Sequence, residues 1–258
     1  MNYWAERIAK NQEKIQDKTI KQINKQLQKY YGRAMDRVIR DFESVYNKVW
    51  KAVEDGKEPT PADLYKLDKY WEAQAQMRKE LQRLGDRKIQ ILSKAFETNF
   101  FDIYYSIALP GEAAFNTIDT VAVSQIINSV WVADGKQWSQ RVWDNTERLA
   151  QTLNDELIHI VATGKKDSDL KQALQERFNV SYHRAETLAR TEVAHIQTEA
   201  AKKRYEDYGI EYVEVLVDPD DRTCELCKAL QGKRFPTTGT PPLPVHPNER
   251  CCLVPVLD

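Results

Sequence analysis

The chain has 258 residues, enough for one large domain or two smaller ones, and its 38 lysines and arginines nearly balance its 39 aspartates and glutamates. The resulting net charge of −1 excludes a uniformly basic nucleic-acid coat, and no apolar run approaches the roughly 18 residues of a membrane-spanning helix. The N-terminal sequence MNYWAERIAKNQEK has no apolar signal-peptide core, so we do not expect export.

Residues 3–52 are predicted to form one long helix or a slightly broken pair. Apolar residues recur there mostly at steps of 3, 4, 7 or 8, Gly32 is the only glycine, and proline is absent. The segment carries twelve lysines and arginines against six acidic residues. Two interpretations of this excess remain open: a solvated helix face, or a surface that contacts nucleic acid.

A break at residues 54–60 precedes the next predicted helix. Thr60 is a suitable N-cap, Pro61 suits the first turn, and Asp63 lies near the positive helix end. We expect this helix to run over 61–84 and to end at Gly85. The later helices are predicted at 87–109 before Pro110-Gly111, 112–132, 138–163 before Gly164, 168–178 opened by Ser168, and 181–208 opened by Ser181 and closed by Gly209.

The pattern changes after Gly209. Residues 211–217 alternate, with Val213, Val215 and Val217 on one face, and this alternation predicts a strand. Short strands are also predicted at 233–235 and 253–256. The fold class is therefore mainly α: a long-helix body is followed by a small α+β C-terminal module with a Cys/His zinc knot.

All four cysteines lie in this last module. Cys224 and Cys227 form a C-x2-C pair, eighteen residues separate Cys227 from His246, and four more separate His246 from Cys251. This spacing favours a structural zinc ion held by Cys224, Cys227, His246 and Cys251, with Cys252 able to replace Cys251. Two other interpretations remain: ordinary buried thiols, or a redox-active C-x2-C pair, although no βαβ pattern surrounds it.

Two Glu-x-x-His pairs on predicted helices, Glu156/His159 and Glu192/His195, have the spacing of a di-iron bundle, but nothing marks the other two carboxylates. The run Arg190–Glu192 could be a catalytic pair, an ion-paired helix face, or a contact that docks the metal module. Gly-rich phosphate loops and nucleophile elbows are absent from the sequence, so we do not expect an enzyme.

These features together resemble the phage minor head proteins, also called Mu F-like head morphogenesis proteins. The resemblance is strongest over 131–150, 184–215 and the cysteine-containing tail. The family signature Arg-Thr-Glu corresponds to Arg190–Glu192, and its C-x2-C corresponds to Cys224 and Cys227. The family closes on His-Pro-x-Cys-Arg-Cys, which here begins at His246 and has Glu249 where the first of the two cysteines usually stands.

The resemblance implies a long-helix N-terminal region at 1–135 and a Mu F-like head morphogenesis domain at 136–258. Within that domain, helices occupy 136–209 and the β/zinc module occupies 210–258. It also implies a non-enzymatic minor protein of a tailed-phage head, which supports head assembly or the packaging and delivery of DNA. The expected partners are the portal protein, then capsid or scaffolding protein, and non-specifically double-stranded DNA. The expected location is the head interior of the virion, and the host cytoplasm during assembly.

Two alternatives from other functional classes remain. The first is a nucleic-acid-binding zinc module unrelated to phage heads. The second is a metalloenzyme, which would need an open coordination position. The cations that would carry the first alternative are Lys202, Lys203, Arg204, Lys228, Lys233 and Arg234.

Overall fold

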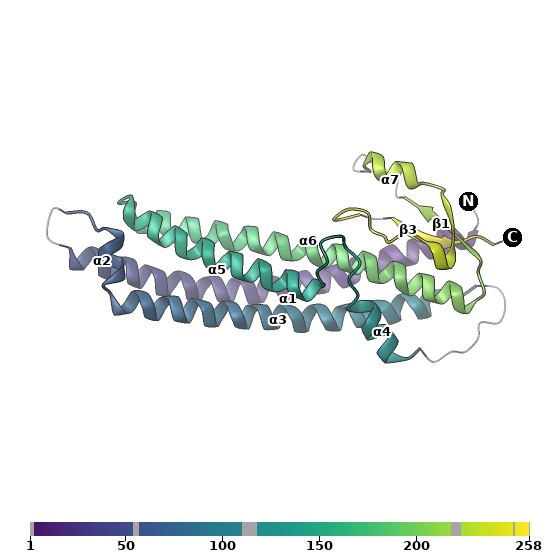
Figure 1. The fold of residues 1–258 in the computed structure, drawn as a ribbon, viewed down its shortest axis with the longest axis horizontal. Helices are drawn as coiled ribbons and strands as arrows, with labels where there is room; N and C mark the ends of the chain where they lie inside the picture. The colour runs from purple at the N-terminus through teal and green to yellow at the C-terminus, as the bar shows by residue number, and fades with distance from the viewer. Residues whose placement is uncertain (1–2, 54–56, 110–117, 218–222, 250, 258) are drawn as a thin grey trace. The chain divides into compact units, whose positions relative to one another are not determined.

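A computed structural model describes residues 3–53, 57–109, 118–217, 223–249 and 251–257 (Figure 1). The predicted fold class is confirmed in outline, because the chain is mainly helical and carries a small three-stranded antiparallel sheet near its C-terminus. The elements, in chain order, are α1 (Tyr3–Ala52), α2 (Pro61–Tyr65), α3 (Asp68–Ser106), α4 (Thr120–Ile127), α5 (Trp138–Ala162), α6 (Asp167–Asp207), β1 (Tyr212–Leu216), α7 (Glu225–Leu230), β2 (Arg234–Pro236), a 3-10 turn (Thr237–Gly239) and β3 (Cys252–Pro255). Among the described residues, no helix is both long and apolar enough to cross a bilayer.

The chain divides into two compact units, each built from separate stretches of sequence. Unit 1 comprises residues 1–24, 92–138 and 187–258, and unit 2 comprises residues 25–91 and 139–186. Both units therefore draw on α1, α3 and α6. The expected boundary at residue 135 divides the chain into two continuous segments, whereas each compact unit combines separate segments. That boundary stays a prediction.

The first predicted elements are confirmed where the structure describes them. Helix α1 continues through Gly32 without a break. Thr60 and Asp63 form a capping box at the start of α2, in which Asp63 Oδ2 accepts the Thr60 N–H at 3.1 Å. Hydrogen bonds from Thr60 and from Lys66 lower the pKa of Asp63 to about 2. Only part of the predicted break at 54–60 lies within the described residues.

The prediction that a helix spans 61–84 and ends at Gly85 is wrong in two ways. Helix α2 ends after five residues, and α3 then runs from Asp68 to Ser106 straight through Gly85. The reason lies in tertiary packing within unit 2: a Cβ built on Gly85 would lie 2.4 Å from Cζ3 of Trp143. Glycine is present here because the indole ring of α5 packs directly against the backbone of α3.

We predict that Gly85→Ala destabilises the protein by about 1–3 kcal/mol, because the methyl group would force the Trp143 ring, which is 39 % exposed, away from its contact with α3. Gly32→Ala is the matched control: it lies in a helix of the same unit, and its added Cβ would meet nothing within 4 Å. We expect the control to stabilise by about 0.5–1 kcal/mol through helix propensity. Urea unfolding followed by circular dichroism checks both values, and a stabilised Gly85→Ala variant would contradict the packing argument.

The two helices predicted at 168–178 and 181–208 are one continuous helix, α6, so Ser181 does not open a new one. Its carbonyl instead accepts hydrogen bonds from Tyr31 Oη at 3.1 Å and from Asn145 Nδ2 at 3.0 Å. The predicted helix stops at Gly164 and Gly209 are confirmed, with φ values of 62° and 70° in the left-handed region.

A polar layer lies within the core of unit 2. Besides the contacts at Ser181, Lys88 is only 1 % exposed and donates from Nζ to Thr146 Oγ1 at 2.6 Å. The same ammonium group lies 5.5 Å from the centre of the Tyr31 ring. The surrounding core residues include Leu27, Val38, Phe42, Met77, Leu81, Leu153, Leu157 and Phe178.

Unit 1 carries the sheet, in the order β2-β1-β3 with both pairings antiparallel. All three predicted strands are confirmed, with small shifts at their ends. Val213 and Val215 are fully buried, as their alternation predicts. The sheet is fixed to α6 by Tyr205, whose buried hydroxyl donates to the Leu253 carbonyl of β3 at 2.9 Å.

Helix α4 is shorter than the helix predicted over 112–132. It begins after Asp119, whose side chain caps it by accepting the Val121 N–H at 2.9 Å, and it ends at Ile127. Residues 112–117 of the prediction, and the stop at Pro110-Gly111, lie outside the described residues.

A candidate metal centre in the C-terminal module

The C-x2-C pair lies at the start of a short helix, and this placement brings its two sulfur atoms together. Cys224 is the N-cap of α7, and its Sγ accepts the backbone N–H of Cys227 at 3.4 Å. One helical turn therefore places both thiols on the same side of α7. All four cysteines of the chain are free thiols.

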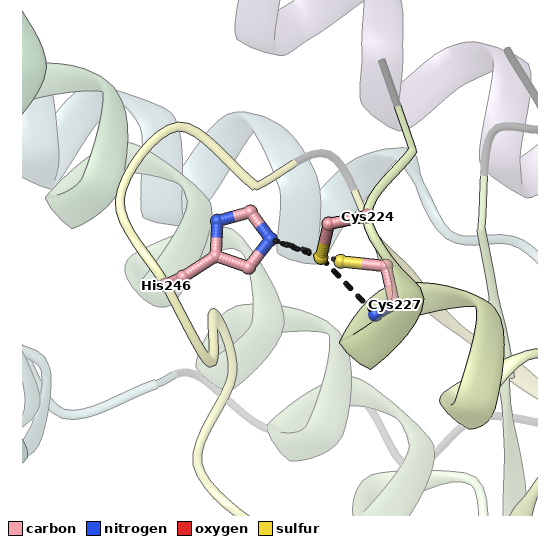
Figure 2. Close-up of side chains that lie close together, drawn as sticks. All are labelled: Cys224, Cys227 and His246. Atoms are coloured by element: carbon pink, nitrogen blue, oxygen red, sulfur yellow. Dashed lines mark hydrogen bonds between the residues drawn. The ribbon is translucent and has the colours of Figure 1, made fainter. Parts of the chain in front are cut away.

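His246 reaches these thiols from the loop that precedes β3. Its Nε2 atom lies 3.2 Å from Cys224 Sγ and 3.0 Å from Cys227 Sγ, and Figure 2 shows the ring directed at the two sulfurs. The other ring nitrogen, Nδ1, lies 2.9 Å from the carbonyl oxygen of Pro247. A proton on Nδ1 would satisfy that carbonyl and leave the lone pair of Nε2 facing the sulfurs, which is the tautomer of a metal ligand.

A second group of donors overlaps the first. Cys227, Glu249 and Cys251 each place a ligand atom within 4.8 Å of the other two, so Cys227 belongs to both groups. Glu249 is only 4 % exposed; one carboxylate oxygen accepts the backbone N–H groups of Val245 and His246, and the other has no hydrogen-bond partner in the part of the chain that is described.

The environment tunes the four titratable donors differently. The backbone N–H of Cys227 lowers the pKa of the Cys224 thiol, whereas burial raises the pKa of Cys227 to about 11. Burial first, and then the neighbouring Glu249, also raise the pKa of Cys251. The hydrogen bond to Pro247 raises the pKa of His246. Sulfur, nitrogen and carboxylate donors in one place suit Zn²⁺, whose tetrahedral ligands lie roughly 3.5–3.8 Å apart given its bond lengths. These residues could hold a metal.

The structure thus brings together Cys224, Cys227 and His246, and it places Cys251 beside Cys227 rather than next to all three. Cys252 is in neither group: it lies in β3, paired with Leu216 of β1.

The helix signature Arg190–Glu192 lies where α6 meets this module. The Thr191 hydroxyl accepts the Asn248 N–H at 3.4 Å, and His195 Nδ1 lies 2.9 Å from the Leu243 carbonyl. Both contacts hold the loop that carries His246, so the structure agrees with the docking interpretation of this signature.

Trp131 supports the same contact. Its indole N–H donates to Glu192 Oε2 at 3.0 Å, and its ring stacks on the imidazole of His195 with centroids 4.1 Å apart. Glu192 and His195 are 2 % and 4 % exposed, and burial lowers the pKa of His195. Two residues with the di-iron spacing, Glu192 and His195, therefore serve packing and hydrogen bonding here.

The other Glu-x-x-His pair lies in unit 2, where Glu156 accepts hydrogen bonds from Arg177 and His159 is exposed. Within the described ranges, neither pair belongs to a group of three metal-ligating side chains.

The cations expected to carry nucleic-acid binding in unit 1 are mostly neutralised. Lys202 pairs with Glu199 at 3.0 Å and Lys203 pairs with Asp207 at 2.6 Å. Arg204 lies over the rings of Tyr104 and Tyr208, while Lys228 pairs with Glu225 and Arg234 with Glu214.

Sequence reasoning did not identify Glu249 as a metal donor or Trp131 as part of the docking contact. A signal existed for Glu249, because it stands where the resembled family has a cysteine, and glutamate is also a zinc ligand. No local pattern marks Trp131, which precedes Glu192 by 61 residues.

Neither the curated proteins nor the solved structures contain a match to this chain. Residues 151–253 match the family model described as Phage Mu protein F like protein. The matched segment contains Arg190–Glu192, most of the sheet, α7 and all the candidate metal ligands, so this part of the chain is similar to the Mu F-like family.

Proposed function

We propose that the chain is a non-enzymatic minor head protein of a tailed phage, located in the head interior and associated with the portal protein. The observation that carries this proposal is the match of residues 151–253, since the Mu F-like family is a family of structural phage head proteins. The family match suggests a role in phage head morphogenesis, and the proposal adds the portal contact and a role in packaging or delivery of DNA.

The C-terminal module is proposed to be stabilised by a structural zinc ion bound to Cys224, Cys227, His246 and Cys251. The ligand atoms of Cys224, Cys227 and His246 lie within 4.8 Å of one another, and the Cys251 thiol lies within the same distance of Cys227. Four protein ligands leave no position for a catalytic water, so such a site stabilises the fold and performs no chemistry. The module needs this support because its sheet has three strands of only three to five residues.

Portal association is tested by purifying particles from infected cells and quantifying this chain by mass spectrometry. We expect it in every particle population that contains the portal protein, in few copies, and also bound to the portal protein when the two are expressed together. Particles assembled without a portal are the matched control and should lack the chain. Portal-containing, DNA-filled particles without the chain would refute the proposal.

A further inference from the structure

Four arginines line one surface hollow of unit 2. They belong to other segments of the chain than the candidate metal ligands. The hollow has a volume of about 190 Å³ and lies between α1 and α3. Its charged lining consists of Arg33 and Arg37 from α1 and Arg83, Arg87 and Glu80 from α3. Four cationic side chains and one acidic side chain therefore border the same small volume.

The sequence builds this arrangement from two like-charged pairs. Arg33 and Arg37 are four residues apart, and so are Arg83 and Arg87, so each pair shares one face of its helix. Like charges at this spacing destabilise a helix. The two pairs also face each other across the hollow, and the repulsion between four cations favours the entry of an anion.

Glu80 positions two of the four guanidinium groups. One of its carboxylate oxygens bonds Arg37 Nη1 at 2.7 Å, the other bonds Arg83 Nη1 at 2.5 Å, and its side chain is only 12 % exposed. This single acid therefore joins the two helices and neutralises only part of the charge. Arg37 and Arg83 remain 52 % and 56 % exposed, so their other N–H groups stay accessible.

Arg33 and Arg87 complete the cationic lining without a carboxylate partner among the described residues. The guanidinium group of Arg87 lies 5.8 Å from the centre of the Tyr30 ring and donates to the side chain of Gln90 at 2.7 Å. This cation–π contact with Tyr30 leaves the charge of Arg87 uncompensated by an acid. Four cations of unit 1 differ in this respect, because each pairs with an acid: Lys202, Lys203, Lys228 and Arg234.

We propose that this hollow binds a phosphate group, either of a nucleic-acid backbone or of a free polyphosphate. Guanidinium groups are planar forks that bind phosphate oxygens in pairs of hydrogen bonds, and a phosphate concentrates negative charge on one compact group. Four guanidinium groups around one hollow therefore suit a phosphate group better than several separate carboxylates. The site goes beyond the proposed function, which assigns no ligand to this part of the molecule.

The test uses the full chain and two probes: a fluorescent 20-base-pair DNA duplex, and tripolyphosphate measured by calorimetry. The double variant Arg33→Gln/Arg87→Gln removes the two arginines of the hollow that do not pair with Glu80. We expect about a tenfold or greater loss of affinity, and a salt dependence of duplex binding that is shallower by about two contacts. The matched control, Arg40→Gln/Arg78→Gln, makes the same charge change on the same two helices outside the hollow and should alter affinity by less than twofold.

The outcomes separate the two sources of phosphate. Binding of both probes identifies the phosphate group itself as the ligand, whereas binding of the duplex alone identifies the nucleic-acid backbone. The proposal is overturned if the wild-type chain binds neither probe, if both double variants lose affinity equally, or if polyglutamate competes as well as the phosphate probes. Because the readout is ligand affinity, failure here leaves the portal proposal intact.

Discussion

Replacement of Cys227 by Ser is expected to abolish zinc binding and to unfold the C-terminal module. Cys227 belongs to both groups of donors. Its loss therefore removes a ligand from each group at once. Structural zinc sites in small modules contribute about 10–16 kcal/mol of apparent binding free energy. Against this, the apolar side chains that the three short strands bury are chiefly Val213, Val215, Leu216, Leu253 and Val254. We therefore expect the module to lose several kcal/mol of stability.

The measurement combines elemental analysis with thermal unfolding in the presence and absence of a chelator. Wild type should contain about one zinc per chain and should melt at a lower temperature after chelation. Cys252→Ser is the matched control, because Cys252 lies on β3 outside both donor groups, and this variant should keep its zinc. A Cys227→Ser protein that still binds one zinc, or a wild-type melt that ignores the chelator, would refute the metal centre.

Some elements of the fold could be predicted because their signals are local. The capping box at Thr60 and the left-handed glycines Gly164 and Gly209 act within a few residues, and the alternation around Val213 depends only on which face of a strand is buried. Gly85 shows where this reasoning fails. An isolated sequence cannot distinguish a glycine that ends a helix from one that makes room for Trp143, 58 residues later in the chain.

The metal site could likewise be predicted only in part. The spacing of Cys224, Cys227 and His246 indicates that they can converge, and α7 and the following loop do bring them together. The contribution of Glu249 depends on the path of the loop, in which Asn248 adopts a φ of 61° and the carboxylate turns back onto the amides of Val245 and His246. Spacing alone carries no information about that path.

The buried charge of Lys88 is a second feature that periodicity does not reveal, and it leads to a large expected effect. Lys88→Met should stabilise the protein at pH 7 by about 2–4 kcal/mol. Burial lowers the pKa of Lys88 to about 7, against about 10.4 in an unfolded chain, and each pKa unit corresponds to about 1.4 kcal/mol. Methionine has a similar length and no charge to desolvate, although the hydrogen bond to Thr146 is lost.

The pH dependence distinguishes this cause from simple repacking. Between about pH 7 and 10 the unfolded chain holds a proton on Lys88 that the folded protein has released, so wild-type stability should rise with pH by up to about 1.4 kcal/mol per unit. Below about pH 7 both states are protonated and the full cost is present. Tyr31, the other titratable group beside Lys88, has a pKa raised by burial to about 12, so the folded protein keeps this phenol neutral in that window.

The advantage of Lys88→Met should therefore shrink steadily from pH 7 to pH 9.5 in urea unfolding experiments. The control is Lys79→Met, an exposed position on the same helix, for which we expect a change of less than about 0.5 kcal/mol at either pH. If Lys88→Met destabilises the protein by the same amount at both pH values, Lys88 contributes through packing and its buried ammonium group carries no such cost. If the difference narrows as expected, the polar layer of unit 2 lowers the stability of its own bundle at neutral pH.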